Sequence, residues 1–343
     1  MNVRAVLLGL SVSAAGGALF AWLRVPLPWM MGSLLAMAAA QMAGAGLEAP
    51  RGAREAGLLV VGVTLGLYFT PPVAREVSAY GGYFVALGFA ALGIGAVSAA
   101  VLERMAGVDH ATAFFGSMPG GAAEMAMMGE RYGAQVDRVA FAHSARMLLV
   151  VTLVPSAITL AGFSATEDYR PVVVAFVPAG LAALFAAAAI GGAIARYFRV
   201  PTPFMMGPLV VTIALTVSGV SLSSVPTLLS NIAQVLLGCV LGSRFERGFL
   251  SKAPRFAMAI VPSVALTLGL AALVGWAISR LSGAYLGTAL LSAAPGGIAE
   301  MSITAKVLRI GVAFVTAAHV VRYAIVVLFS VLAFRLLAAR RLR

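Results

Sequence analysis

The residue pattern most able to do chemistry is a proline and two glycines with a glutamate three positions later, set inside an apolar run. The pattern occurs twice, as Pro119, Gly120, Gly121 and Glu124, and as Pro295, Gly296, Gly297 and Glu300. A carboxylate within an apolar segment costs free energy, so such groups usually have a function. We therefore interpret Glu124 and Glu300 as candidate sites for a coupling proton or sodium ion. The alternative is a carboxylate that only satisfies backbone amides at a helix start.

A histidine and an arginine, three residues apart, follow each of these blocks. His143 and Arg146 form the first pair, and His319 and Arg322 form the second. The spacing places both side chains of a pair on one helix face. An arginine can bind an anion through two parallel hydrogen bonds, and a histidine can carry a proton near neutral pH. The alternative is a buried ion pair, with Glu124 as the partner of Arg146, that never contacts substrate.

The glycines at each block favour a close approach of ligand to exposed backbone amides. We therefore predict that Pro119, Gly120, Gly121 and Arg146 bind substrate, together with Pro295, Gly296, Gly297 and Arg322. The predicted ion-coupling residues are Glu124, His143, Glu300 and His319.

The composition identifies the setting of these residues. Of 343 residues, 61% are hydrophobic and 10% are charged, and the mean hydropathy is +1.00. A soluble domain has about 25% charged residues, so this composition excludes a soluble enzyme as well as a disordered protein. The net charge of +12 fits loops that face anionic lipid better than a nucleic-acid surface. The chain is predicted to be an all-α polytopic membrane protein.

An internal duplication organises the chain. Residues 24–34 match residues 199–209 at eight of eleven positions, and residues 113–125 match residues 289–301 at seven of thirteen. The offsets of 175 and 176 residues are far longer than the repeat of a solenoid protein. The two predicted repeats are residues 1–163 and 164–343.

Twelve apolar segments are expected, but two of them need not cross the membrane. The segments are 3–23, 28–46, 56–70, 77–102, 111–129, 135–162, 171–195, 203–219, 228–243, 254–278, 285–305 and 311–336. If 111–129 and 285–305 are re-entrant hairpins, each repeat has five spanning helices and the repeats are inverted. Sixteen Lys and Arg residues then lie on the side of the termini and six lie opposite. This bias predicts that both termini are cytoplasmic.

The hairpin interpretation agrees with the local residues, because proline breaks a helix and glycine permits a sharp turn. Each flanking arm has about ten residues, roughly 15 Å of helix, which is half of a bilayer. The alternative is a kinked or broken helix that still crosses. With all twelve segments crossing, the repeats would be parallel.

The paired RVPxPxMMGxL and PGGxAEM blocks, together with the duplication, resemble the AbrB-like bacterial membrane family. Its members often carry the labels ammonia monooxygenase or AbrB-type regulator. The stretch LPWMMGSLLAM, followed by EAGLLVVGVTLG, also resembles the opening of cation–proton antiporter and anion-transporter repeats. These resemblances imply a secondary transporter with two inverted repeats, each with a broken or re-entrant element, but name no substrate.

The residues do not favour an enzyme or a DNA-binding regulator. Three histidines and a single cysteine offer no metal-ligating motif, so we expect no catalytic residues, no metal and no cofactor. The basic residues are scattered over short loops, which is unlike a nucleic-acid surface.

We therefore expect a transporter of a small organic or amino-acid-like anion, coupled to H⁺ or Na⁺, in the bacterial inner membrane. Its partners would be that solute, the coupling ion and the bilayer, with a homodimer as a further arrangement. The alternative function is a membrane sensor that passes no flux and affects gene expression indirectly.

Overall fold

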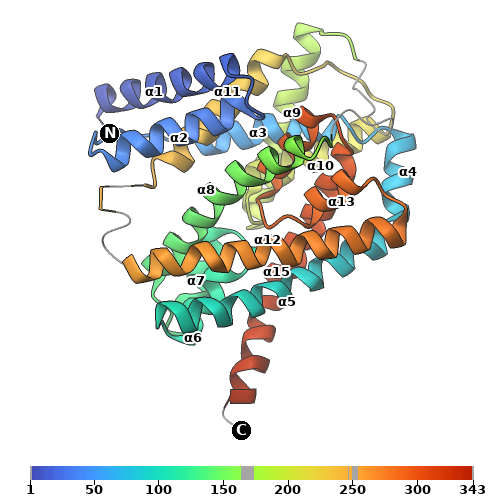
Figure 1. The fold of residues 1–343 in the computed structure, drawn as a ribbon. Helices are drawn as coiled ribbons and strands as arrows, with labels where there is room; N and C mark the ends of the chain where they lie inside the picture. Colours follow the sequence, from blue (N-terminus) through green and yellow to red (C-terminus); the bar gives the residue numbers. More distant parts are fainter. Residues whose placement is uncertain (1, 164–173, 246, 249–253, 342–343) are drawn as a thin grey trace. The chain divides into compact units, whose positions relative to one another are not determined.

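The computed structural model describes residues 2–163, 174–245, 247–248 and 254–341, and these residues form fifteen α-helices and no strand (Figure 1). The prediction of an all-helical chain is therefore confirmed. The predicted boundary between the repeats, at residues 163 and 164, meets a stretch, 164–173, that lies outside the described residues.

The helices divide into two compact units, and each unit draws on both sequence repeats. The first unit comprises residues 1–78, 159–249 and 302–313, and the second comprises residues 79–158, 250–301 and 314–343. The first unit contains α1 (Val3–Trp22), α2 (Pro28–Met42), α3 (Ala53–Gly66), most of α4 (Pro71–Ala79), α9 (Pro178–Tyr197), α10 (Pro203–Val217) and α11 (Thr227–Gly242).

The second unit contains the segments with the chemically active residues. Its helices are α5 (Gly81–Ala106), α6 (His110–Ser117), α7 (Ala122–Glu130), most of α8 (Val136–Leu160), α12 (Pro254–Ser282), α13 (Leu286–Ala293) and most of α15 (Val312–Arg341). Helix α14 (Ile298–Leu308) begins in the second unit and ends in the first.

The duplicated RVPxP segment performs the same turn in both copies. Leu27 and Thr202 precede α2 and α10 with φ angles of 51° and 46°, in the left-handed region that residues with a side chain rarely adopt. The next residue in each copy, Pro28 or Pro203, opens the helix at a position where the missing amide hydrogen is no loss. The repeated sequence therefore encodes a repeated helix start.

Close glycine contacts then fix how these helices pack in the first unit. Gly32 of α2 lies directly against the backbone of Gly16 in α1, and Gly207 of α10 lies in the same way against Gly191 in α9. A Cβ at Gly32 or Gly207 would overlap the facing carbonyl oxygen. The same sequence motif thus produces the same helix pair twice.

The two copies also exchange partners within the first unit. Gly62 of α3 packs against Met205 and Pro208 of α10, whereas Gly238 of α11 packs against α2 near Met30 and Ser33. Gly62 and Gly238 are equivalent in the duplication. Each of these two contacts therefore joins a helix of the first copy to a helix of the second copy. For this reason the first compact unit contains helices from both sequence repeats.

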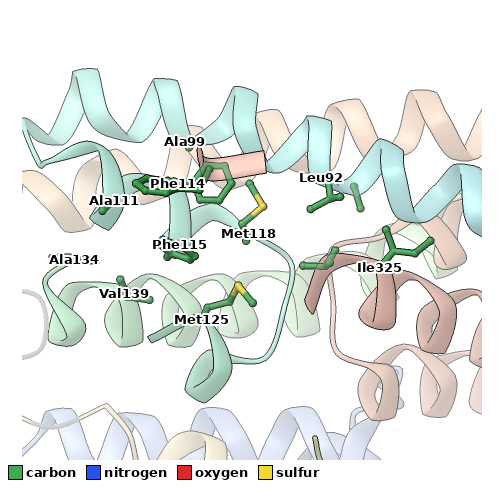
Figure 2. Packing of buried hydrophobic residues seen from close by; sticks show 13 residues of the cluster. Leu92, Ala99, Ala111, Phe114, Phe115, Met118, Met125, Ala134, Val139 and Ile325 are labelled. Atoms are coloured by element: carbon green, nitrogen blue, oxygen red, sulfur yellow. The ribbon is translucent and has the colours of Figure 1, made fainter. Parts of the chain in front are cut away.

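In the second unit, α5 packs against α6 and α12, and α12 packs against α13. A cluster of buried apolar side chains surrounds α6, and its members Phe114, Phe115, Met118 and Met125 are fully buried (Figure 2). This core holds the short helices that carry the candidate site.

Six of the described helices are long and apolar enough to cross a membrane by length and composition: α1, α5, α8, α9, α12 and α15. The expected spans at 28–46, 56–70, 203–219 and 228–243 form helices of 14 to 16 residues. A helix of that length is roughly 22 Å long, shorter than the hydrocarbon core of a typical bilayer. Helix α3 meets α4 at a 92° bend, and the two together would add one further span. The total of ten spans therefore stays a prediction.

The glycine contacts generate a test of the duplicated packing. We expect Gly32→Ala and Gly207→Ala each to destabilise the purified protein by about 1–3 kcal/mol, because the added methyl group forces two packed backbones apart. Thermal unfolding in detergent measures the effect. The matched control is Gly93→Ala in α5, where the added Cβ meets no atom within 4 Å and helix propensity improves by about 0.5–1 kcal/mol. Equal stability of all three variants would contradict this packing.

Candidate functional site

Both Pro-Gly-Gly blocks interrupt the helix, and they do so in the same way. Helix α6 ends at Ser117 and α7 begins at Ala122; α13 ends at Ala293 and α14 begins at Ile298. We call residues 118–121 the first break and residues 294–297 the second break. Met118 and Ala294, the residues before the prolines, are extended, with ψ angles of 134° and 138°. The following proline disfavours the helical conformation at these positions, so the sequence itself favours both helix ends.

The two arginines bind the carbonyl groups that these breaks leave without helical partners. Arg146 donates to the carbonyl oxygens of Met118 at 2.8 Å and Ser117 at 3.3 Å. Arg322 donates to the carbonyl oxygens of Ala294 and Gly296. The last carbonyls of a helix need such donors. Each arginine therefore stabilises the break of its own repeat.

The expected ion pair between Arg146 and Glu124 is wrong. The described partners of Arg146 are the carbonyl oxygens of Ser117 and Met118 and the ring of His143, and no ion pair joins it to Glu124. The backbone carbonyls take the place of the glutamate, because α6 presents them directly to α8. The two arginines are only 5% and 2% exposed.

His143 assists Arg146. Its Nδ1 lies 2.9 Å from an Arg146 guanidinium nitrogen, and its Nε2 lies 2.9 Å from the carbonyl oxygen of Phe115. The guanidinium can only donate, so Nδ1 accepts and Nε2 carries the hydrogen donated to Phe115. His143 is therefore neutral in this arrangement. His319 is also fully buried, on α15.

The glutamates lie at the opposite side of each break, over a helix start. Glu124 and Glu300 are the third residues of α7 and α14. A Cβ at Gly121 or Gly297, the residue before each helix, would overlap the carboxylate of that glutamate. The carboxylates thus fold back to the positive helix ends, a position that stabilises their charge, and a side chain at either glycine would displace them.

The two breaks also contact the helices of the opposite repeat. A Cβ added at Gly121 would lie 3.2 Å from the Tyr323 hydroxyl of α15, and one added at Gly297 would lie 3.4 Å from Cε of Met147 in α8. Met147 and Tyr323 are equivalent in the duplication and directly follow the arginines. The breaks, arginines, histidines and glutamates predicted from the sequence are therefore brought together in the second unit.

Met147 and Tyr323 were not singled out by the sequence argument. Their position could have indicated them, because both directly follow an arginine of the repeated His–Arg pair, but their residue types differ between the copies.

Ser117 adds a hydroxyl at the first break. Its side chain is 7% exposed, and its oxygen has no hydrogen-bonding partner among the described residues.

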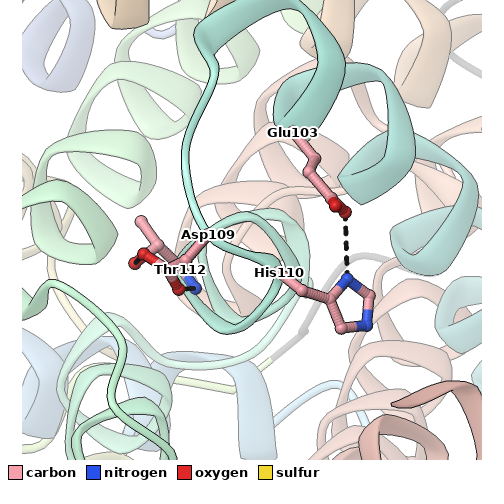
Figure 3. Close-up of polar contacts among 4 residues, drawn as sticks. All are labelled: Glu103, Asp109, His110 and Thr112. Carbon is pink, nitrogen blue, oxygen red and sulfur yellow. Dashed lines mark hydrogen bonds and ion pairs between the residues drawn. The ribbon is translucent and has the colours of Figure 1, made fainter. Parts of the chain in front are cut away.

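The start of α6 has its own polar cluster. Asp109 accepts hydrogen bonds from the backbone nitrogen of Thr112 at 2.8 Å and from its hydroxyl at 2.7 Å, and Gln135 donates to it at 3.1 Å. On the other side of the chain, His110 points toward Glu103 and forms an ion pair at 3.0 Å when protonated (Figure 3). These contacts fix the outer end of the helix whose inner end is the first break.

The described residues contain no cluster of three or more His, Cys, Asp or Glu side chains that could hold a metal ion. What the site offers is positive charge and hydrogen-bond donors in an apolar interior. Such an arrangement can bind an anion.

Comparisons with known proteins agree on one family. The AbrB profile, described as transition state regulatory protein AbrB, matches residues 29–338. YhjN of Bacillus subtilis (strain 168), named an uncharacterized protein, is 26% identical over 350 residues, which cover 93% of this chain and 89% of that protein. The Escherichia coli (strain K12) protein named "Putative regulator AbrB" is 25% identical over 315 residues, which cover 91% of this chain and 89% of that protein.

The Asp109 cap generates a pH-dependent prediction. Burial would raise the pKa of Asp109, but the hydrogen bonds from Thr112 and Gln135 outweigh it and the pKa lies below the ordinary value of 3.8. A lowered folded-state pKa stabilises the protein above pH 3.8, and the contribution is lost as pH falls through the folded-state pKa. We expect Asp109→Ala to lower the melting temperature at pH 7 and to lose this effect below pH 3.8. Thermal unfolding between pH 3 and 7 measures it.

The control for this prediction is Asp109→Asn. Asparagine also caps helices but does not titrate in this range. Its stability relative to the alanine variant should not change with pH. A difference between wild type and Asp109→Ala that stays constant down to pH 3 would contradict the role of the carboxylate.

Proposed function

The chain belongs to the AbrB family, and on this premise we propose that it is a secondary active transporter of a small organic or amino-acid-like anion, coupled to H⁺ or Na⁺. The substrate would bind near the two breaks, at mid-membrane, in the bacterial inner membrane. No catalytic step is proposed.

The observation that carries the proposal is the pair of buried arginines. Each guanidinium donates to carbonyl groups through its terminal nitrogens, while its Nε has no hydrogen-bonding partner among the described residues. An unpaired charge inside a protein is costly. Two such buried positive charges in the second unit are stabilised by negative charge, which an anionic substrate would supply.

The packing supports inverted repeats as the transport architecture. Break-to-helix contacts cross between the repeats in the second unit, and the glycine contacts exchange partners in the first. Transporters built from two inverted repeats place broken helices on either side of one substrate site. We propose that the two breaks are re-entrant and that both termini are cytoplasmic.

His143 offers a means of coupling. Uptake of a proton at Nδ1 would remove the acceptor that now holds the Arg146 guanidinium, since the protonated ring has only donors. Protonation would release one arginine nitrogen and alter its affinity for an anion. Glu124 and Glu300, at the helix starts beyond the breaks, are the proposed sites for the coupling ion, with His319 as the second histidine.

A sensor without flux is the second candidate, and the regulator name of the Escherichia coli relative favours it. A sensor would bind the same anion at the same arginines. Binding and transport therefore have to be measured separately.

We expect a screen of carboxylates, amino acids and phosphate to find an anion that raises the melting temperature of the purified protein. A ligand present at 100 times its Kd stabilises the folded state by about 2.7 kcal/mol. Arg146→Gln and Arg322→Gln should each abolish this stabilisation and the uptake of the same anion into proteoliposomes. The matched control is Arg138→Gln, which removes a half-buried positive charge from the same helix as Arg146.

Persistence of the thermal shift in both arginine variants would refute the substrate site. Anion binding that depends on the arginines, without uptake or exchange under any proton or sodium gradient, would favour the sensor instead. A shift also lost in Arg138→Gln would show only a general effect of net charge.

A further inference from the structure

A second polar site lies in the first unit, where α14 ends against α3 and α11. It is a small pocket with walls of Val60, Val61, Leu65 and Ile303, and its polar residues are Thr64, Ser230, Gln234 and Lys306. The pocket leaves room for about one water-sized particle. The transport mechanism proposed above uses none of these residues.

Lys306 gives the pocket its charge. Its ammonium group donates to the Ser230 hydroxyl at 3.2 Å, and among the described residues no carboxylate oxygen lies within 4.0 Å of it. An ammonium group has three hydrogens to donate. A partly buried cation without a countercharge is stabilised by an anion bound beside it.

Two further polar side chains of the pocket have unused hydrogen-bonding capacity. The Thr64 hydroxyl and the Gln234 carbonyl oxygen have no partner among the described residues, although Thr64 is 8% and Gln234 6% exposed. Buried polar atoms normally find a partner. The hydroxyl can rotate to donate. The Gln234 amide nitrogen donates to the Ser230 carbonyl oxygen at 3.4 Å, and a half-turn of the amide would exchange this long hydrogen bond for an NH₂ group directed into the pocket.

The duplication shows that this pocket does not simply follow from the repeated fold. With the offset of 176 residues, the counterparts of Ser230 and Gln234 are Arg54 and Leu58, and those of Thr64 and Lys306 are Val240 and Glu130. The polar set therefore occurs in one copy only. Residues needed merely to form the helix contacts would be expected in both.

We propose that this pocket binds a halide-sized inorganic anion, with chloride as the available one. Lys306 supplies the charge, Ser230 and Thr64 supply hydroxyl donors, and Gln234 supplies an amide donor. The small volume favours a monatomic anion over an organic one. All lining residues belong to the first unit, whereas Arg146 and Arg322 belong to the second, so this site is distinct from the arginine site.

The experiment measures the ³⁵Cl NMR linewidth of chloride in the presence of the purified full-length protein in a gluconate buffer. A bound chloride in fast exchange broadens the line, and bromide should remove the excess broadening by competition. We expect the saturable broadening to fall at least fivefold in Lys306→Gln and to decrease in Gln234→Leu and Thr64→Val. The matched control, Arg54→Gln, removes an exposed positive charge from the same unit and should keep the broadening.

Several results would overturn the proposal. Wild-type protein without saturable broadening, or broadening unchanged in Lys306→Gln, would exclude chloride from this pocket. Loss of broadening in Arg146→Gln, with Lys306→Gln unaffected, would assign the chloride to the arginine site. If Lys306→Gln does not fold, the near-isosteric Thr64→Val decides, because it leaves the charge in place and removes one donor.

Discussion

Helices that end in the interior of the second unit leave carbonyl groups without helical partners, and these groups need hydrogen-bond donors from side chains. Arg146 and Arg322 meet this need at the ends of α6 and α13, which have eight residues each. Because a guanidinium has five hydrogens to donate, capping a helix end does not exhaust it. The two arginines that stabilise the broken helices therefore also place two positive charges in an apolar interior. Replacing either arginine would change both the stability of the break and the charge of the site.

The charges are arranged along the breaks rather than in direct pairs. At the first break, Arg146 lies at the negative end of α6 and Glu124 lies over the positive end of α7. Each charge is matched by the partial charge of a helix end. A direct ion pair would neutralise both groups, whereas this arrangement keeps the two charges apart, as the proposed binding of an anion at Arg146 and a coupling ion at Glu124 requires.

Much of this could be predicted from the sequence, because the information is local or repeated. Pro119 and Pro295 determine the extended residues before them, and the repeated RVPxP segment determines two helix starts. The contacts between helices of different repeats could not be predicted in this way, because they depend on which glycine packs against which backbone in a segment distant in sequence. The partner of Arg146 was predicted wrongly. Residue spacing predicts which side chains share a helix face, but it does not predict whether a carboxylate or a nearby backbone carbonyl accepts the hydrogen bonds of an arginine.

The duplication is most informative where it fails. Asp109 caps α6, while the equivalent residue before α13 is Tyr285, which has no carboxylate. Lys306 and Glu130 occupy equivalent positions with opposite charge. Both arginines donate to two carbonyl groups, but His143 also accepts a hydrogen bond from Arg146, and among the described residues no such bond joins His319 to Arg322. Equal repeats would give two equivalent breaks with the same response to ions. Because the repeated helices are shared and these polar groups are not, different contacts stabilise the two breaks. In the proposed mechanism, a proton at His143 would act on one arginine without an identical effect on the other.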